Sequence, residues 1–419
     1  EAHHLPKKAL SQFAAEHSLH QAVWALEKLP QITDKIAAVA DKAELANLAD
    51  EAAAALLDSL YEWQFHLGDT PELAYNDSGR DPQWLWQDGQ IPEGLALLVS
   101  NTAAAAQSLY KHANSLNDAL AAARREKDSD SAQIDRLSSE FGIFRARIEQ
   151  ISAVWDLLAT EPVGDAPPLA KWIECSHNSD KTDYSFHASP VSAAAMLAAG
   201  LWRRAAGAIL TSATLQSLGS FQHLLQQTGL QWLPETTTLA LESPFNFPAQ
   251  GELYIPPVAA SPKQADAHTA EIAEWLPKLI SPEEAVGTLV LFSSRKQMQD
   301  VALRLPESHL PLLLIQGDLP KAILLERHRQ AIAEGRASIL FGLDSFAEGL
   351  DLPGSDCAHV IIAKLPFTMP DHPIEKTRSR WIEQRGGNPF MEITVPEAGI
   401  KLTQAVGRLI RTEHDYEDT

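Results

Sequence analysis

From residue 169 onward the chain alternates short apolar runs with stretches of helical spacing, and this alternation restricts the fold more than any other feature. Buried parallel strands read as continuous apolar runs, because helices cover both faces of their sheet. The sequence therefore predicts an α/β fold with an open, mostly parallel sheet. The apolar runs are "GAILTSATL" (207–215), "GTLVLFSS" (287–294), "LPLLLIQG" (310–317), "ASILFGLDSF" (337–346) and "AHVIIAKLPF" (358–367).

Small, polar and charged residues follow these runs, where the carboxyl ends of parallel strands collect ligands. "TSAT" (211–214), "SSRKQ" (293–297) and "SFAEGLDLPG" (345–354) are three such stretches. Each also has a purely structural interpretation. "TSAT" fits a plain turn of small residues, Ser294 fits a helix N-cap, and "SFAEGLDLPG" fits a strand-to-loop turn with solvated carboxylates. In isolation no stretch decides between structure and function.

The first half of the chain is rich in Ala and Leu at helical spacing. "DKAELANLADEAAAALLDSLYEW" (41–63) repeats apolar residues at i, i+3 and i+4, which predicts a helical domain. In this half, packing is a better interpretation of Trp84 and Trp86 than stacking on bases. Arg124 and Arg125 fit a solvated helix face better than a DNA-binding site.

The stretch "LTQAVGRLIRTEHD" (402–415) predicts a helix with two different faces. Arginine carries a permanent charge and a fixed fork of donors suited to a nucleotide γ-phosphate. Surface ion pairs of Arg408 and Arg411 with Glu413 or Asp415 are the alternative interpretation. The apolar face contains Leu402, Ala405, Val406, Leu409 and Ile410, and the other face contains Gln404, Gly407, Arg408 and Arg411.

The composition narrows the class of protein. The net charge of −21 argues against nucleic acid as a partner, although a basic groove can lie on an otherwise acidic protein. The two cysteines have no metal-ligand spacing and indicate a reducing compartment. A membrane span would need about 20 apolar residues in a row, and the sequence contains no such run. The expectation is a cytoplasmic protein without a membrane partner.

The order of these stretches resembles that of the superfamily 2 helicases. "LTSATL" looks like motif III, "TLVLFSSRKQ" like motif IV, "SFAEGLDLPG" like motif V and "QAVGRLIR" like motif VI. "EAHHLP" at the start looks like the end of a DEAH box. The long helical stretch between that box and "TSAT" is similar to the insertion of the XPD-like helicases.

This resemblance implies two RecA-like P-loop NTPase motor domains, the first incomplete, with a large all-α arch-like insertion. Residues 1–12 would finish the DEAH box of motor domain 1, and 13–166 would form the insertion. Residues 167–216 would return to motor domain 1, and 217–419 would form motor domain 2. In such helicases the two motor domains bind ATP between them and move along single-stranded DNA.

The resemblance also implies a role for each matching residue. Glu1 would activate the attacking water, His3 would connect the ATP and DNA sites, and Arg408 and Arg411 would reach the phosphates. The other implied roles are nucleotide binding by Gln404, Gly407, Glu348, Gly349 and Asp351, DNA binding by Ser294, Arg295, Ser345 and Thr211, and coupling of the two sites by Ser212 and Thr214.

Two departures limit these expectations. The residues contain no G-x-x-x-x-G-K-[ST] phosphate cradle, and no Asp precedes Glu1 to hold Mg²⁺, so these 419 residues alone are expected to be inactive. The family's 4Fe-4S cluster would belong to a preceding region, because Cys175 and Cys357 are wrongly placed for it.

The implied function is ATP- and Mg²⁺-dependent, 5′-to-3′ unwinding of DNA. Forks, displacement loops or R-loops in repair and replication would be the substrates of a monomeric enzyme. A non-catalytic DNA- or protein-binding module derived from a helicase, and an RNA helicase, are the alternatives.

Overall fold

The computed structural model describes residues 15–74, 81–126, 130–178, 181–243, 245–343, 346 and 350–410. The chain divides into two compact units. The first comprises Glu1–Ala193 and Pro370–Asn388, and the second comprises Ala194–Met369 and Pro389–Thr419. Within the described ranges, no helix is both long and apolar enough to cross a membrane.

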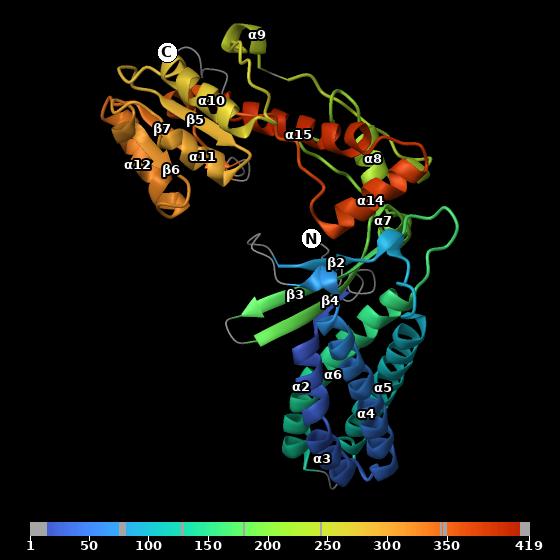
Figure 1. Ribbon diagram of the computed structural model, residues 1–419. Coiled ribbons are helices and arrows are strands. Elements are labelled where there is room, and N and C mark those ends of the chain that lie inside the picture. The colour runs from blue at the N-terminus through green and yellow to red at the C-terminus, as the bar shows by residue number, and fades with distance from the viewer. Residues whose placement is uncertain are drawn as a thin grey trace. The chain divides into compact units, whose positions relative to one another are not determined.

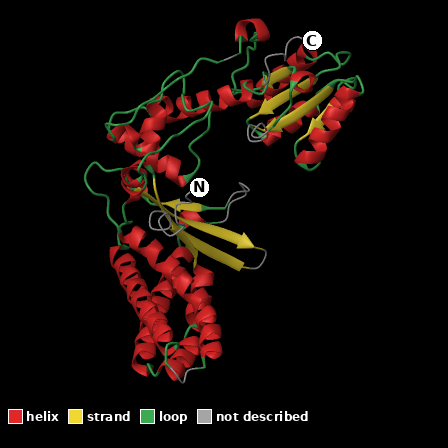
Figure 2. Ribbon diagram, turned by 180° about the vertical axis from the view of Figure 1, so that it is seen from behind, coloured by secondary structure: helices red, strands yellow, loops and turns green. Residues whose placement is uncertain are grey.

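Five helices of the first unit form a bundle (Figures 1 and 2). Small and apolar residues at helical spacing give each helix a face that can be buried. On α4 this face includes Ala49, Leu56, Leu60 and Trp63, all fully buried. The helical domain expected in the first half is thus present. Its helices are α2 (Leu19–Lys28), α3 (Pro30–Ala40), α4 (Ala43–Gly68), α5 (Ala96–Ala123) and α6 (Ser131–Ala159).

The first unit also contains a four-stranded antiparallel sheet, which was not expected from the sequence. Its strand order is β1-β4-β3-β2. Ile173 and Phe186 lie on the face that joins the core of the bundle, and Trp172 lies on the opposite face. The strands are β1 (Ala15–Ser18), β2 (Gln83–Leu85), β3 (Leu169–Asn178) and β4 (Lys181–Pro190), and the short 3₁₀ turns η1 (Pro71–Leu73) and η2 (Gln87–Gly89) flank β2.

Two polar anchors join this sheet to the bundle. Asp183 accepts hydrogen bonds from the Ser18 hydroxyl (2.6 Å) and the His20 amide (3.0 Å), which holds the start of α2. Lys171 is fully buried and donates from Nζ to the carbonyl oxygen of Leu158, 2.9 Å away, at the end of α6. A cation at this position complements the negative end of the helix. Burial nevertheless lowers the pKa of Lys171 to about 8.

Trp84 and Trp86 both pack into this core, as the sequence favoured. Trp86 is buried and Trp84 is partly buried against the same cluster. The two rings lie 6.3 Å apart edge to face. The buried Trp86 ring therefore offers no open face that could stack on a base.

His17 is a buried titratable group in this core. Its ring stacks on Phe186 at 5.2 Å, and burial lowers its pKa from 6.5 to about 4. Between these pH values the unfolded chain binds a proton that the folded chain does not, so stability falls as the pH falls. At pH 5 the cost is about 2 kcal/mol.

We therefore expect the wild type to lose about 2 kcal/mol more stability between pH 7 and pH 5 than a His17→Phe variant, which keeps a ring but cannot titrate. Urea unfolding followed by circular dichroism at both pH values measures this difference. Equal losses in the two proteins would show that His17 does not cause the acid sensitivity.

The second unit contains the parallel sheet that the sequence predicts (Figure 1). The strand order is β6-β7-β5-β8, and every neighbouring pair is parallel. The predicted fold class, α/β with a large helical segment, is therefore confirmed. The strands are β5 (Gly287–Phe292), β6 (Leu313–Ile315), β7 (Ser338–Leu343) and β8 (His359–Ile362).

Helices cover both faces of this sheet. Ile272 of α10 and Met298 of α11 pack on one face, and Leu324 of α12 and Ala405 of α15 pack on the other. This two-sided burial explains the uninterrupted apolar runs in the sequence. The described helices of this unit are α7 (Ala194–Gly200), α8 (Gln222–Thr228), α9 (Phe247–Gln250), α10 (Ala265–Leu279), α11 (Arg295–Ala302), α12 (Lys321–Ala333) and α15 (Val395–Val406). Its short turns are η3 (Trp202–Arg204), η4 (Leu230–Trp232), η5 (Leu310–Leu312), η6 (Gly354–Cys357) and the π-helical η7 (Phe390–Thr394).

Two local expectations were wrong. The run 207–215 is not a strand, and Ile209 in it is 94% exposed. An apolar segment becomes a buried strand only beside pairing partners, and no described strand pairs with it. The helix expected over 402–415 instead begins at Val395 and ends at Val406. Ala405 and Ile410 are buried as expected, whereas Val406 is 45% exposed.

Candidate functional site

The carboxyl end of β5 presents Ser294 and Arg295, the two residues of the motif IV stretch expected to bind DNA. Ser294 caps α11, and its hydroxyl accepts a hydrogen bond from the Gln297 amide. A role of Ser294 as helix N-cap is compatible with a role in DNA binding, because the residue is exposed. Arg295 is exposed as well. Its guanidinium lies against Gly317, where an added Cβ would come within 2.8 Å of Arg295 Nη1.

The stretch after β7, which resembles motif V, is described only in part. Ser345, Glu348 and Gly349 lie outside the described residues. Leu350 is buried in the core below the sheet, whereas the Asp351 side chain is exposed.

The motif VI stretch reaches this same loop. Arg408 donates from Nη1 to the carbonyl oxygen of Leu350 at 2.8 Å. The carbonyl oxygen of the next residue, Asp351, accepts a hydrogen bond of 2.7 Å from Arg329 Nη2 on α12. Two arginines from different parts of the chain thus hold consecutive carbonyl groups. Arg411, the second arginine of the motif, lies outside the described residues.

Gly407 follows α15 as its C-cap residue. Its backbone φ of −65° is ordinary, so conformational freedom is not required there. An added Cβ would instead lie 3.1 Å from the Thr403 carbonyl oxygen. The missing side chain therefore leaves room at the end of the helix, next to Arg408.

The "TSAT" stretch lies against α15 at Gln404. Gln404 Nε2 donates to Thr214 Oγ1 at 3.4 Å, and the hydroxyl groups of Ser212 and Thr214 are 3.3 Å apart. Thr211 is exposed in the same loop. Farther along this segment, Ser217 Oγ donates to the carbonyl oxygen of Pro396 at 2.7 Å. The structure therefore brings the motif III stretch to the helix of motif VI.

Three polar residues around the motif V loop were not singled out from the sequence. Gln316 Oε1 accepts a hydrogen bond from the Leu343 amide at 2.8 Å, where β7 ends. Lys321 Nζ donates to the carbonyl oxygen of Phe346 at 3.0 Å. The third is Arg329, whose Nη2 donates to the Asp351 carbonyl oxygen. Lys321 and Arg329 are eight residues apart on α12, which is close to two helical turns. This spacing was the feature of the sequence that could have indicated that both side chains face one loop.

The remaining expected residues, Glu1 and His3, lie outside the described residues. Within the described ranges, no three His, Cys, Asp or Glu side chains form a group that could hold a metal ion by themselves. An iron–sulfur cluster needs cysteine thiolates. Cys175 and Cys357 belong to different units, both are buried, and burial raises the pKa of the Cys175 thiol to about 11. These cysteines do not fit a cluster, and no chemical step is assigned to one.

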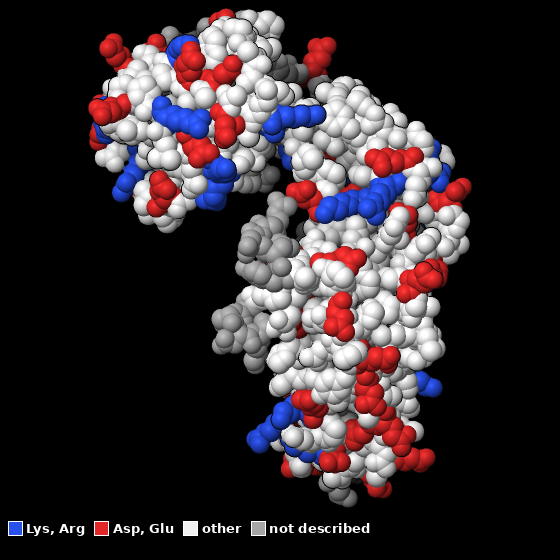
Figure 3. All heavy atoms as spheres, viewed as in Figure 1, with Lys and Arg blue, Asp and Glu red and all other residues white. Residues whose placement is uncertain are grey.

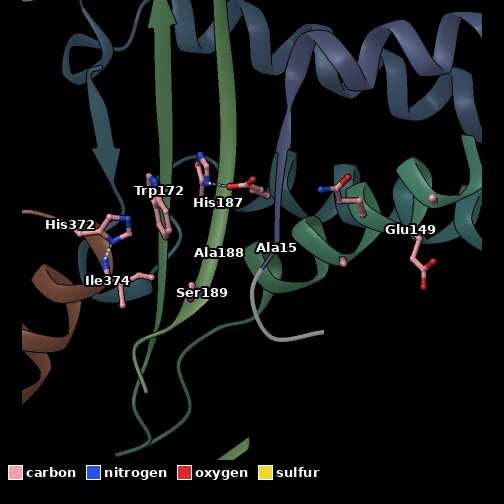
Figure 4. Close-up of a pocket in the computed structure, with 12 residues that line it drawn as sticks. Ala15, Glu149, Trp172, His187, Ala188, Ser189, His372 and Ile374 are labelled. Atoms are coloured by element: carbon pink, nitrogen blue, oxygen red, sulfur yellow. Dashed lines mark hydrogen bonds and ion pairs between the residues drawn. The ribbon is translucent and has the colours of Figure 1, made fainter. Parts of the chain in front are cut away.

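A cavity of about 630 Å³ lies in the first unit, and none of the described motif residues lines it (Figure 4). Glu16, Trp172 and His187 line it from the sheet, Glu149 lines it from α6, and His372 lines it from the start of α14 (Pro373–Gln384). Trp172 and His187 stack on each other at 4.7 Å, and His187 lies 3.3 Å from the Glu16 carboxylate. The stacked rings of Trp172 and His187 thus each cover one face of the other.

Charge is unevenly distributed over the surface (Figure 3). On the face shown, acidic side chains outnumber basic ones along the helical bundle. The part with the parallel sheet shows both signs close together. The acidic side chains on the face shown would repel a phosphate backbone, whereas an exposed cation such as Arg295 would attract it.

Comparison with known proteins gives relatives for nearly the whole chain. Residues 278–417 match the family described as "Helicase C-terminal domain". The ATP-dependent DNA helicase DinG of Photobacterium profundum is 37% identical over 422 residues, which covers 99% of this chain and 59% of the relative.

DinG of Escherichia coli (strain K12) is 30% identical over 419 residues, covering 98% of this chain and 58% of the relative. DinG of Shigella flexneri is 32% identical over 358 residues, covering 85% and 49%. The chain thus spans less than two thirds of the length of these curated relatives. It is a homologue of the DinG ATP-dependent DNA helicases along nearly its whole length, with a match to the helicase C-terminal domain at 278–417.

Proposed function

We propose that this chain is part of an ATP-driven DNA helicase that moves 5′ to 3′ and separates strands at forks, displacement loops or R-loops. The observation that carries the proposal is the convergence of motif residues on one helix end. Gln404 contacts Thr214 of motif III, and Arg408 contacts Leu350 beside Asp351 of motif V. Helicases of this type would use such contacts to link nucleotide binding to DNA movement. The polarity and the DNA structures rest on the resemblance alone.

The proposed roles follow the positions of the residues. Arg408, together with Arg411, would stabilise the phosphates of ATP, because a guanidinium near developing charge lowers the barrier to phosphoryl transfer. Gln404 would sense the nucleotide and pass its state to Ser212 and Thr214. Mg²⁺ would supply charge neutralisation at the phosphates when ATP is bound.

The proposed domain division keeps the insertion at 13–166 and motor domain 2 at 217–419. The helical bundle supports the first range. The parallel sheet, with α10 and α11 on one face and α12 on the other, supports the second range apart from residues 370–388, which belong to the first compact unit. Residues 1–12 and 167–216 would belong to motor domain 1.

ATP hydrolysis by the full-length protein, measured with single-stranded DNA and with RNA of the same length, tests the proposal. We expect strong stimulation by DNA and little by RNA. Equal stimulation by RNA would favour an RNA helicase. DNA binding without any ATP hydrolysis would favour a non-catalytic module, an alternative consistent with the acidic bundle as a protein-binding surface.

For DNA binding we predict a specific effect of Arg295. Its replacement by Ala removes an exposed cation at the carboxyl end of β5, so affinity for single-stranded DNA should fall. The slope of log K against log salt should fall by about one unit in magnitude. Fluorescence anisotropy at several salt concentrations measures both quantities.

Arg304 provides the matched control, because it follows the opposite end of α11 and is also exposed. Arg304→Ala should leave the salt slope unchanged. If Arg295→Ala alters nucleotide affinity and leaves the DNA slope intact, its assignment to DNA is wrong.

A further inference from the structure

Helix α14 has an unusual place in the molecule. In the sequence it lies between Asp351 of motif V and Gln404 of motif VI, inside the segment that matches the helicase C-terminal domain. In the structure residues 370–388, which contain α14, belong to the first unit, together with the bundle and the antiparallel sheet. A piece of the motor segment is thus built into the unit that contains the insertion.

The start of α14 packs on the face of the sheet that points away from the bundle. His372 meets Trp172 edge to face at 5.4 Å, and Trp172 is only 6% exposed (Figure 4). Ile374 packs against a small apolar cluster that contains Ala170, Trp172 and Val191. His372 also caps the helix, because its Nδ1 accepts a hydrogen bond from the Ile374 amide. One residue therefore orders the helix start and fixes it to the sheet.

The end of α14 has a separate, polar attachment. Gln384 Nε2 donates to Asp88 Oδ2 at 2.9 Å, in the short turn η2 that follows β2. Arg385 Nη1 donates to the carbonyl oxygen of Asp165 at 3.1 Å, in the segment between α6 and β3. The helix is thus fixed at both ends, through contacts that are chemically different.

The connection from α14 to the motif VI residues is short. Gly386, at φ +76°, follows the attached Arg385, and residues 387–389 lead into η7 and then directly into α15. Gln404 lies on that same continuous helix. A displacement of α15 caused by the nucleotide must be absorbed in this short link or be passed to α14.

We propose that α14 is a transmission element that carries nucleotide-dependent movement of α15 to the sheet and, through the sheet, to the helical bundle. This proposal rests on the proposed helicase function. It predicts that strand separation depends on the contacts of α14 with the sheet, whereas ATP hydrolysis does not. Coupling of this kind requires an element whose position is influenced both by the nucleotide site and by the helical bundle. Helix α14 packs on the sheet that joins the bundle, and it is covalently linked to α15, which contains Gln404.

Two variants test the proposal in the full-length protein. Ile374→Asp places a carboxylate in the apolar cluster at the start of the helix. The double variant Gln384→Ala/Arg385→Ala removes the polar attachment at its end and leaves the apolar cluster intact. For either variant we expect DNA-stimulated ATP hydrolysis within about twofold of the wild type, and at least about a tenfold loss of strand separation per ATP. Arg380→Ala, on the exposed side of α14, is the matched control and should change neither rate.

Hydrogen exchange gives a readout that simple destabilisation would not reproduce. In the wild type, a non-hydrolysable ATP analogue should change amide exchange in β3 relative to ADP. In the double variant that nucleotide-dependent change should disappear, while exchange in the ADP state stays the same.

Equal loss of hydrolysis and strand separation would show that α14 only holds the fold, and unchanged strand separation in both variants would overturn the proposal. A wild-type protein that hydrolyses no ATP on DNA would instead contradict the proposed function itself, so the two failures are distinguishable.

Discussion

Replacing Arg408 by Ala in the full-length protein is expected to lower the maximal rate of DNA-stimulated ATP hydrolysis by at least about 100-fold. The Arg408 guanidinium donates to the Leu350 carbonyl oxygen, which places its charge beside the motif V loop. Removing a charge that acts mainly on the transition state lowers kcat more than it raises KM. Steady-state hydrolysis at saturating single-stranded DNA, with ATP varied, separates the two constants. Arg411→Ala should have an effect of the same size.

Two further variants distinguish catalysis from loss of folding or of DNA contact. Arg336 is an exposed arginine that pairs with Glu334 after α12, and Arg336→Ala should leave kcat unchanged. Arg408→Lys keeps the charge but loses the fork of donors, so it should restore only part of the rate. A normal kcat in Arg408→Ala, or a loss of DNA affinity as large as the loss of rate, would refute the role in phosphoryl transfer.

The second large effect concerns the stability of the bundle. Trp63 is fully buried, and its Nε1 donates to Thr102 Oγ1 at 3.1 Å. Its ring lies 5.3 Å from Trp155 and 5.5 Å from Phe186, so it joins α4 and α6 to the sheet. Trp63→Ala should lower the free energy of unfolding of this unit by about 3–5 kcal/mol, through lost contacts and the cavity left behind. Hydrogen exchange of the α4 to α6 amides measures that free energy locally.

Phe65 is the matched control for this effect, two residues away on the same helix and 79% exposed. Phe65→Ala should change the exchange free energy by no more than about 0.5 kcal/mol. A large effect of Phe65→Ala would show that this face of α4 is covered in the full-length protein. A small effect of Trp63→Ala would contradict the packing described here.

The parallel sheet was predictable because its signal is local. Each of β5, β6, β7 and β8 is a short apolar run with turn residues after it, and burial on both faces removes the alternation of polar residues. The antiparallel sheet lacked this signal. β4 reads "KTDYSFHASP", where polar and apolar residues alternate weakly, and the buried residues of its partner strands include His17 and Lys171, two residues that seldom occupy a core.

The motif residues could be located from sequence order, but their contacts could not. The hydrogen bond from Gln404 to Thr214 joins residues 190 positions apart, and that from Arg408 to Leu350 joins residues 58 positions apart. Only the folded chain shows that Arg329 holds the neighbouring carbonyl group. The end of α15 at Val406 was also not predictable from periodicity, since the apolar spacing continues to Ile410 after the helix has ended.

The membership of α14 in the first compact unit is the clearest feature that the sequence does not indicate. Its pattern, "PIEKTRSRWIEQ", is that of an ordinary amphipathic helix. Nothing in that pattern states which surface its apolar side contacts. The partner, Trp172, lies 200 positions earlier than His372. Long-range contacts of this kind depend on the complete topology.

We propose that ATP hydrolysis on DNA drives strand separation by the full-length protein. The most direct measurement follows both quantities in one reaction, with full-length protein and a forked DNA duplex that carries a 5′ single-stranded tail. We expect the strands to separate only while ATP is hydrolysed. A non-hydrolysable analogue should support binding without separation, and a fork with a 3′ tail should be a poor substrate. DNA bound with no ATP-dependent separation on either tail would contradict this proposal.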